Sequence, residues 1–166
     1  RTWTDGMRHL LVILAGSPNF FWKLGMTLLS LSLALVLPCL SGPRIIFGHY
    51  GFWGEHTMVL ALLIGFYGAL AANVAILLHS RSNFPKAPAS LRILLDLREG
   101  ALFWWLVGTL VFTMAGCLFV LFEWEQKGYR NINYVTTILF FLYVAVVHST
   151  LLFGIFQAQL GRRARI

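Results

Sequence analysis

Four long apolar runs constrain this chain more than any other feature of its sequence. A helix that crosses about 30 Å of hydrocarbon needs about 20 mostly apolar residues. The runs cover residues 20–40, 57–78, 100–122 and 134–156, and each is long enough. Open strands are excluded because unpaired backbone groups in lipid cost several kcal/mol each. The sequence therefore predicts an all-α fold, a four-helix integral membrane bundle that forms one domain over residues 1–166.

The composition agrees with a multi-pass membrane protein. The chain is 58% hydrophobic and 11% charged, whereas soluble domains carry about 25% charged residues. A soluble fold of this size would leave too much of its apolar surface in water. The net charge is +7, and apart from Lys23 at the start of the first run the charged residues lie outside the apolar runs, so we expect no nucleic-acid partner. The expected partners are membrane lipids, other membrane subunits, or further copies of the chain.

The basic residues predict the orientation in the membrane. Ten of them lie in the N-terminal segment, the second-to-third connection and the C-terminal tail: Arg1, Arg8, Lys23, Arg81, Lys86, Arg92, Arg98, Arg162, Arg163 and Arg165. Only three lie in the other two connections: Arg44, Lys127 and Arg130. Short loops rich in Lys and Arg stay on the cytoplasmic side. Both termini are therefore predicted to face the cytoplasm, or the matrix of an organelle.

Two shorter segments predict helices that lie on the inner membrane surface. Residues 7–15 and 89–98 are amphipathic or apolar and too short to span. Gly16 and Pro18 follow the first segment and would end its helix. The second segment either ends before the third span or runs straight into it.

Histidines are the side chains best suited to hold a cofactor. His56 and His79 lie near opposite ends of the second run, and His148 lies inside the fourth. A membrane haem b needs two imidazoles at matching depth, and none of these pairs matches cleanly. Ionisable groups inside a membrane usually face the bundle interior. We therefore predict that His148 points inward and bonds a Ser or Thr of a neighbouring helix, with ligand, quinone or proton binding as the alternative.

Other polar and small residues predict helix packing. Asn73, inside the second run, is expected to hydrogen-bond across helices. Small residues four apart let helices approach closely. Such pairs are Gly68 with Ala72, Ser30 with Ala34, Ala145 with Ser149, and Thr150 with Gly154. They favour a compact bundle or docking against partner helices.

Two further pairs leave alternatives open. Cys39 and Cys117 are at similar predicted depth, so they are either small packing residues or a disulfide or redox pair. Asp96 and Glu99 precede the third run, where carboxylates favour the helix dipole. The alternative for these two acids is an ion or proton site with His79 at the inner mouth.

The sequence contains no motif that specifies a reaction. HExxH, Walker A, GxSxG and CxxC patterns are all missing. The two outer connections, residues 41–56 and 123–133, are too short for a folded catalytic domain. We therefore predict neither catalytic residues nor a metal site.

Three stretches of the chain have a pattern found in a known family. The first is Tyr50-Gly51-Phe52-Trp53, which leads into the second run. The second is Leu94-Leu95-Asp96 followed by Ala101-Leu102-Phe103, and the third is Leu142-Tyr143-Val144 with Val147-His148. These stretches resemble the MARVEL-domain tetraspan family of the MAL, plasmolipin and chemokine-like factor type. The resemblance covers most of the chain in topology and about 20 residues in detail. It implies four spans, cytoplasmic termini, and a role in membrane apposition, raft organisation or vesicle trafficking without catalysis.

Three functions remain at this point. The main prediction is a non-enzymatic tetraspan, which organises membrane or serves as an accessory subunit of a larger membrane complex. The first alternative is the membrane anchor of a redox complex that binds haem b or quinone through His148 with His79 or His56. The second is a small channel or transporter that uses His148, Asn73 and Asp96.

Overall fold

The computed structural model describes residues 4–9, 16–40, 54–81, 88–128 and 133–163. Its long helices are α2 (Pro18–Leu40), α3 (Glu55–Arg81), α5 (Glu99–Gln126) and α6 (Asn133–Arg163), and α4 (Ala89–Leu95) is a short helix before α5. Each of the four long helices is long and apolar enough to cross a membrane. The predicted all-helical architecture with four candidate spans is confirmed.

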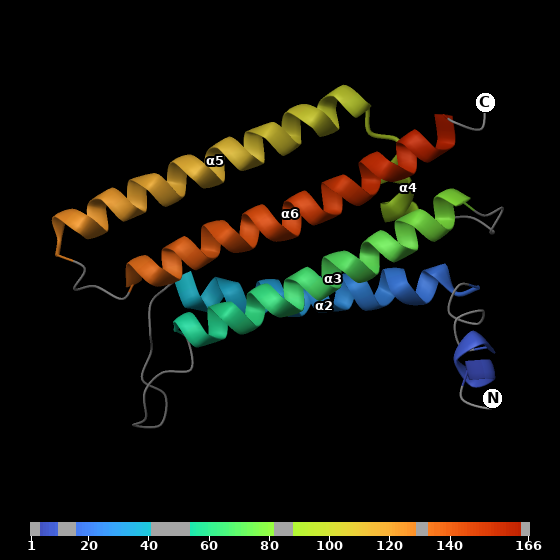
Figure 1. Ribbon diagram of the computed structural model, residues 1–166, viewed down its shortest axis with the longest axis horizontal. Coiled ribbons are helices and arrows are strands. Elements are labelled where there is room, and N and C mark those ends of the chain that lie inside the picture. Colours follow the sequence, from blue (N-terminus) through green and yellow to red (C-terminus); the bar gives the residue numbers. More distant parts are fainter. Residues whose placement is uncertain (1–3, 10–15, 41–53, 82–87, 129–132, 164–166) are drawn as a thin grey trace.

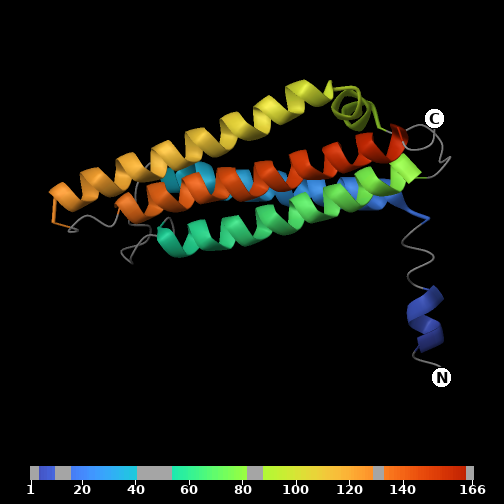
Figure 2. The same cartoon turned by 45° about the horizontal axis from the view of Figure 1, so that its top comes forward.

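The long helices run alternately up and down (Figure 1). The start of α2, the end of α3, α4, the start of α5 and the end of α6 lie at one end of the bundle, here called the α4 end. The other helix termini lie at the opposite end (Figure 2). The helices extend beyond the predicted runs, most clearly α5, which has 28 residues, and α6, which has 31.

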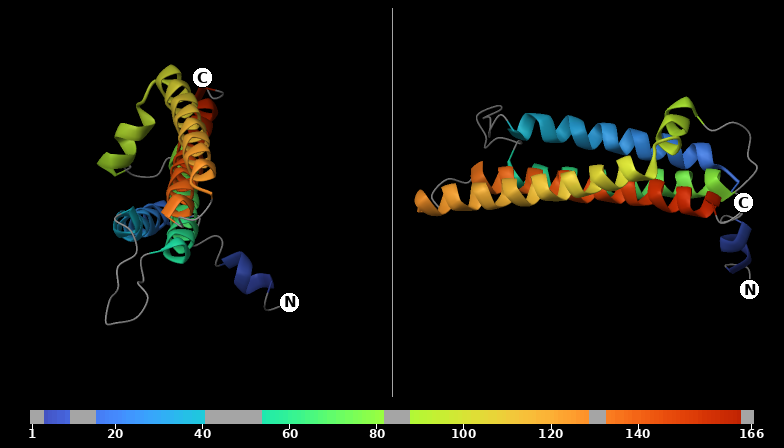
Figure 3. Two further views of the ribbon diagram at one scale, coloured as in Figure 1. Left: turned by 90° about the vertical axis from the view of Figure 1, so that its left-hand side faces the viewer. Right: turned by 90° about the horizontal axis from the view of Figure 1, so that it is seen from above.

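The helices pack in the order α2, α3, α6, α5, and not as a closed square. The main contacts are those of α3 with α2 and α6, and of α6 with α3 and α5. Seen from the end, α5 lies apart from α2 and α3 (Figure 3). The central α3 is more buried than α5 at the edge of the row. Within the chain, 39% of the most apolar part of α3 is buried, but only 17% of that part of α5.

Small residues bring α2 and α3 close together. A Cβ on Gly25 would lie 2.7 Å from the backbone nitrogen of Ala72 and 2.8 Å from the carbonyl oxygen of Gly68. Close backbone approach of this kind increases the van der Waals packing that helps helices associate in lipid. Ser32 adds a hydrogen bond, because its hydroxyl donates to the carbonyl oxygen of Ala61 over 2.6 Å.

The helix α5 packs on α6 along one stripe. Its buried residues are Leu102, Thr109, Thr113 and Val120. They are spaced by seven, four and seven residues, which keeps them on one face of a helix. The hydroxyl groups of both threonines donate to carbonyl oxygens within α5, so they carry no unpaired donor into the interface.

The short helix α4 lies beside the bundle, on the side where α2 lies (Figure 3). Leu91 is fully buried in a cluster with Trp22, Leu102 and Ile155, whereas Ile93 is 68% exposed. The helix ends at Leu95, and the backbone N–H of its C-cap residue Asp96 donates to the carbonyl oxygen of Arg92. The predicted helix over 89–98 is therefore shorter, and a turn separates it from α5.

The N-terminal segment is helical over residues 4–9 and exposed there. The rest of the predicted surface helix, residues 10–15, lies outside the described part, as do His49 and the stretch Tyr50 to Trp53.

Candidate functional site

His148 does not point into the bundle as the sequence predicted. Its side chain is exposed on α6, and its ring lies 6.1 Å from the ring of Trp105 on α5, tilted by 46°. His148 follows Tyr134 by 14 residues and precedes Leu160 by 12, and these two residues bound the candidate span. The imidazole is therefore near the middle of the span and on its outer surface.

A second pair of rings repeats this contact along the same two helices. Phe112 of α5 and Phe141 of α6 have ring centroids 5.6 Å apart in an edge-on arrangement. Each member lies seven residues from Trp105 or His148, so the two pairs form successive rungs between antiparallel helices. Gly116 makes room for the second pair of rings, since a Cβ there would clash with the ring of Phe141.

Asn73 joins α3 to α6. Its side-chain nitrogen donates to the carbonyl oxygen of Thr150 over 2.6 Å. Its amide lies against Gly154, where an added Cβ would clash with the Asn73 Oδ1 atom. Thr150 in turn donates its hydroxyl to the carbonyl oxygen of Val146. The Asn73 side chain therefore bonds the backbone of the neighbouring helix through its nitrogen, while its buried Oδ1 atom has no hydrogen-bond partner among the described residues.

The three histidines proposed as ligands are not brought together. His56 and His79 lie at opposite ends of α3. His79 has its Nδ1 atom 2.9 Å from the carbonyl oxygen of Ala75 in its own helix. His148 lies on α6 against Trp105. Within the described ranges, no three His, Cys, Asp or Glu side chains are placed to hold a metal ion.

Small residues at the remaining predicted packing positions differ in their surroundings. Ser30 and Ala34 are exposed on α2, so this pair does not mark a contact within the chain. Ser149 is half-buried, and its hydroxyl has no hydrogen-bond partner among the described residues. Both Cys39 and Cys117 are free thiols, and Cys39 donates to the carbonyl oxygen of Leu35.

The two acids before the third span have separate surroundings. Asp96 is exposed and is the C-cap residue of α4, so it lies outside the first turn of α5. Glu99 is the first residue of α5, where a carboxylate favours the helix dipole. The N-cap of α5 is Arg98, which makes no side-chain capping bond.

A polar cluster links α5 to α6 at the opposite end of the bundle. Lys127 donates to the Tyr134 hydroxyl over 2.5 Å and lies 3.5 Å from a Glu123 carboxylate oxygen. The hydrogen bond with Tyr134 is the main cause that raises the pKa of Lys127, and Glu123 adds to it. Tyr134 also stacks on Trp124, which is the aromatic pairing expected where a span meets the headgroups.

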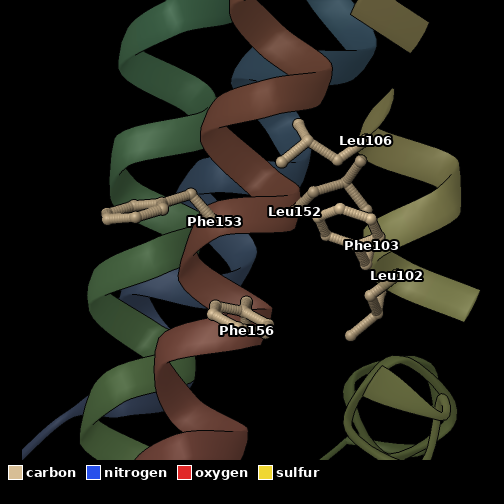
Figure 4. A pocket seen from close by; sticks show the side chains of 6 residues that line it. All are labelled: Leu102, Phe103, Leu106, Leu152, Phe153 and Phe156. Atoms are coloured by element: carbon tan, nitrogen blue, oxygen red, sulfur yellow. The ribbon is translucent and has the colours of Figure 1, made fainter. Parts of the chain in front are cut away.

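A small apolar cleft lies between α5 and α6 near the α4 end (Figure 4). Its volume is about 60 Å³, and its lining residues are Leu102, Phe103, Leu106, Leu152, Phe153 and Phe156. None of these side chains can transfer a proton or bind an ion. The cleft can accept only an apolar group.

Two residues that make contacts between helices were not identified from the sequence. Gln159 donates to the carbonyl oxygen of Leu97 over 2.5 Å and so fixes the turn between α4 and α5 to α6. Gly25 faces Gly68 and Ala72 but has no small neighbour at four-residue spacing in its own helix. A glutamine among apolar residues near a span end was a usable signal for the first, whereas a lone glycine was not.

Comparison with known proteins adds no relative. No family model matches the chain, and neither a curated protein nor a solved structure is significantly similar to it. The resemblance to MARVEL tetraspans stays a prediction from three short stretches.

Proposed function

We propose that the four long helices cross a bilayer and that the α4 end faces the cytoplasm or an organelle matrix. The charge distribution supports this orientation. Arg8, Lys23, Arg92 and Arg98 belong to segments at the α4 end, whereas Glu55 and the cluster of Glu123 with Lys127 belong to the opposite end. Basic residues that flank short spans favour the inner side.

Within that bilayer we propose a non-enzymatic tetraspan that organises membrane or serves as an accessory subunit of a membrane complex. One observation carries this proposal. Three polar side chains between the helices, those of Ser32, Asn73 and Gln159, bond carbonyl oxygens of this chain, so they serve packing. The described surface that remains is broad and apolar, above all on α5.

The resemblance to MARVEL tetraspans supports the same class of function. That family implies membrane apposition, raft organisation or trafficking. Lipids and neighbouring membrane proteins are then the partners, and they meet the outer faces of the helices. Both versions of the proposal, organiser and accessory subunit, place the working surface on the outside of the bundle.

The test is purification from the native membrane in a gentle detergent. Mass analysis of the purified fraction identifies proteins and lipids that migrate with the chain, and an absorption spectrum is taken from the same fraction. Stoichiometric membrane subunits, or the chain with enriched lipid alone, support the proposal and distinguish its two versions. A Soret band would contradict it and favour a haem-binding anchor.

A transport function is tested separately in sealed liposomes. If the chain is an organiser or accessory subunit, reconstituted protein produces no proton or ion flux. A flux that His148→Ala abolishes would contradict the proposal and identify the chain as a channel or transporter.

A further inference from the structure

We propose that this chain associates with a second copy of itself through one face of α5, next to His148. The proposal rests on the outer-surface role proposed above and names the partner. The face is a stripe that runs along α5 at alternating spacings of four and three residues. We call it the α5 stripe; its members are Ala101, Trp105, Gly108, Phe112, Ala115 and Phe119.

His148 is the first reason to expect a partner at this face. Its imidazole is near the middle of the span, about 18 Å from Leu160 by helix rise, too deep to reach the headgroups. It makes a ring contact with Trp105 but no hydrogen bond to any residue that the structure describes. A polar group facing hydrocarbon without a hydrogen bond costs several kcal/mol, and such residues normally face protein or water. Another hydrogen-bonding group must therefore cover it.

The second reason is the pattern of the α5 stripe. All six members are exposed, and they alternate between a small residue and an aromatic one. A seven-residue repeat of this kind keeps one face toward a partner helix and produces left-handed packing. From Ala101 to Phe119 it extends for about 27 Å, close to the full hydrocarbon thickness.

Gly108 is an independent sign of close approach from outside. An added Cβ there would meet no atom of the chain within 4 Å. Packing within the chain therefore does not require a glycine at this position, although glycine weakens a helix interior relative to alanine. Glycine on an exposed helix face in lipid lets a second helix come near.

A second copy is the occupant that fits both features. A neutral imidazole has one donor and one acceptor, so two copies of His148 can bond each other through one N–H···N contact. In a dimer with its two-fold axis along the membrane normal, every residue meets its counterpart at its own depth. The partner group at mid-membrane is then supplied without any other protein.

The exposed rings provide the contact area. Trp105, Phe112 and Phe119 are 49%, 60% and 66% exposed. At about 200 Å² for each aromatic side chain they offer on the order of 350 Å² for each copy. A standard interface buries about 800 Å² on each partner, so the rings supply a little under half of that area, and the small residues between them leave room for rings of the partner.

Cysteine crosslinking in lipid vesicles tests the face. In a chain with Cys39→Ala and Cys117→Ala, single cysteines are placed by Gly108→Cys or Ala115→Cys, with Leu110→Cys as the control. Leu110 is 45% exposed and follows Gly108 by two residues, so it points to the opposite side of α5. Mild oxidation should link copies through the first two positions, because disulfides need Cα atoms about 4.4–6.8 Å apart. The control should stay largely monomeric.

The dimer affinity in vesicles at graded protein-to-lipid ratios tests His148. His148→Leu should weaken association about three- to fifteen-fold, the range for interhelical hydrogen bonds in bilayers. His148→Gln keeps a donor and an acceptor and should retain most of the affinity. If His148→Leu does not fold, Gly108→Leu serves instead, because its side chain enters open space in one chain and blocks the second copy.

Three results would overturn the proposal: equal crosslinking through Leu110→Cys, a monomer at every lipid ratio, or a folded His148→Leu or Gly108→Leu that dimerises as the parent does. A monomer in vesicles that still purifies with other subunits from native membrane would overturn self-association alone. The accessory function proposed above would then stand.

Discussion

At the scale of single residues, the side chains of Asn73 and Ser32 hold neighbouring helices together. Asn73 bonds the carbonyl oxygen of Thr150 and lies against Gly154. Ser32 makes the corresponding bond between α2 and α3. In lipid such bonds contribute about 0.6 kcal/mol on average and up to about 1.7 kcal/mol. They are modest individually but they fix which faces of the helices meet.

Asn73→Leu should therefore destabilise the bundle by about 1 kcal/mol, because the similar volume is kept while the bond to Thr150 is lost. The free energy of unfolding, measured by titration of mixed micelles with a denaturing detergent, checks this. Ser30→Leu is the matched control, since Ser30 is exposed on α2 and should tolerate the change. An equal free energy of unfolding for Asn73→Leu and the parent would show that the bond to Thr150 does not stabilise the bundle.

The sequence predicted residue roles only where spacing carries information. Gly68 and Ala72 were identified as small residues on one helix face, and they lie against Gly25. The outward direction of His148 could not be predicted, because the rule that polar groups face inward applies to the finished assembly. In the single chain, His148 is exposed on the outer face of α6, although the rule expects a polar group in the membrane to face protein or water.

At the scale of helices, α2 and α3 form the tightest pair. Gly25 is the point of closest approach, with backbone atoms of Gly68 and Ala72 within 3.0 Å of the position of a Cβ. Neither neighbour can move without shifting a helix, because both contacts are with the backbone.

Gly25→Ala should destabilise the protein by about 1–3 kcal/mol, as expected for overpacking. Gly100→Ala is the control, because a Cβ at Gly100 meets nothing within 4 Å and alanine favours the helix. Gly25→Ala should lower the apparent Tm in detergent. Gly100→Ala should raise the Tm or leave it unchanged. A Gly25→Ala variant as stable as the parent would contradict the described α2–α3 contact.

The turn between α4 and α5 depends on α6. Gln159 donates to the Leu97 carbonyl oxygen, and Leu91 anchors α4 in the core. Loss of the first bond should loosen the turn without unfolding the bundle, since the buried leucine remains.

Gln159→Leu should therefore speed amide hydrogen exchange in residues 89–98 several-fold, in line with a loss of about 1 kcal/mol. Gln157→Leu, on the exposed side of the same helix, should leave these amides unchanged. Identical exchange in the two variants would count against an anchoring role of Gln159.

At the scale of the whole molecule, the sequence predicted the number and approximate positions of the helices but not their order in space. Twenty apolar residues mark a span by length alone. A span that is apolar on every side gives no amphipathic signal to say which face meets which helix, and α5 is of this kind. Its position at the edge of the row, packed mainly on α6, follows from details of fit such as Gly116 under Phe141.

The arrangement also determines what the molecule can do under the proposal made here. A row of helices with α5 at its edge leaves more surface for lipids and partner helices than a closed square bundle would. The charges at the α4 end orient that surface relative to the two sides of the membrane.

Cysteine accessibility from one side of a sealed membrane tests the central claim, a four-span bundle with its α4 end inside. In a chain with Cys39→Ala and Cys117→Ala, a reagent that cannot cross membranes is added to intact cells or organelles. Gly54→Cys and Gln126→Cys, at the end opposite α4, should react at once. Ser17→Cys and Ala89→Cys, at the α4 end, should react only after the membrane is opened. Reaction of the last two in the intact preparation, or a split within either pair, would contradict the account.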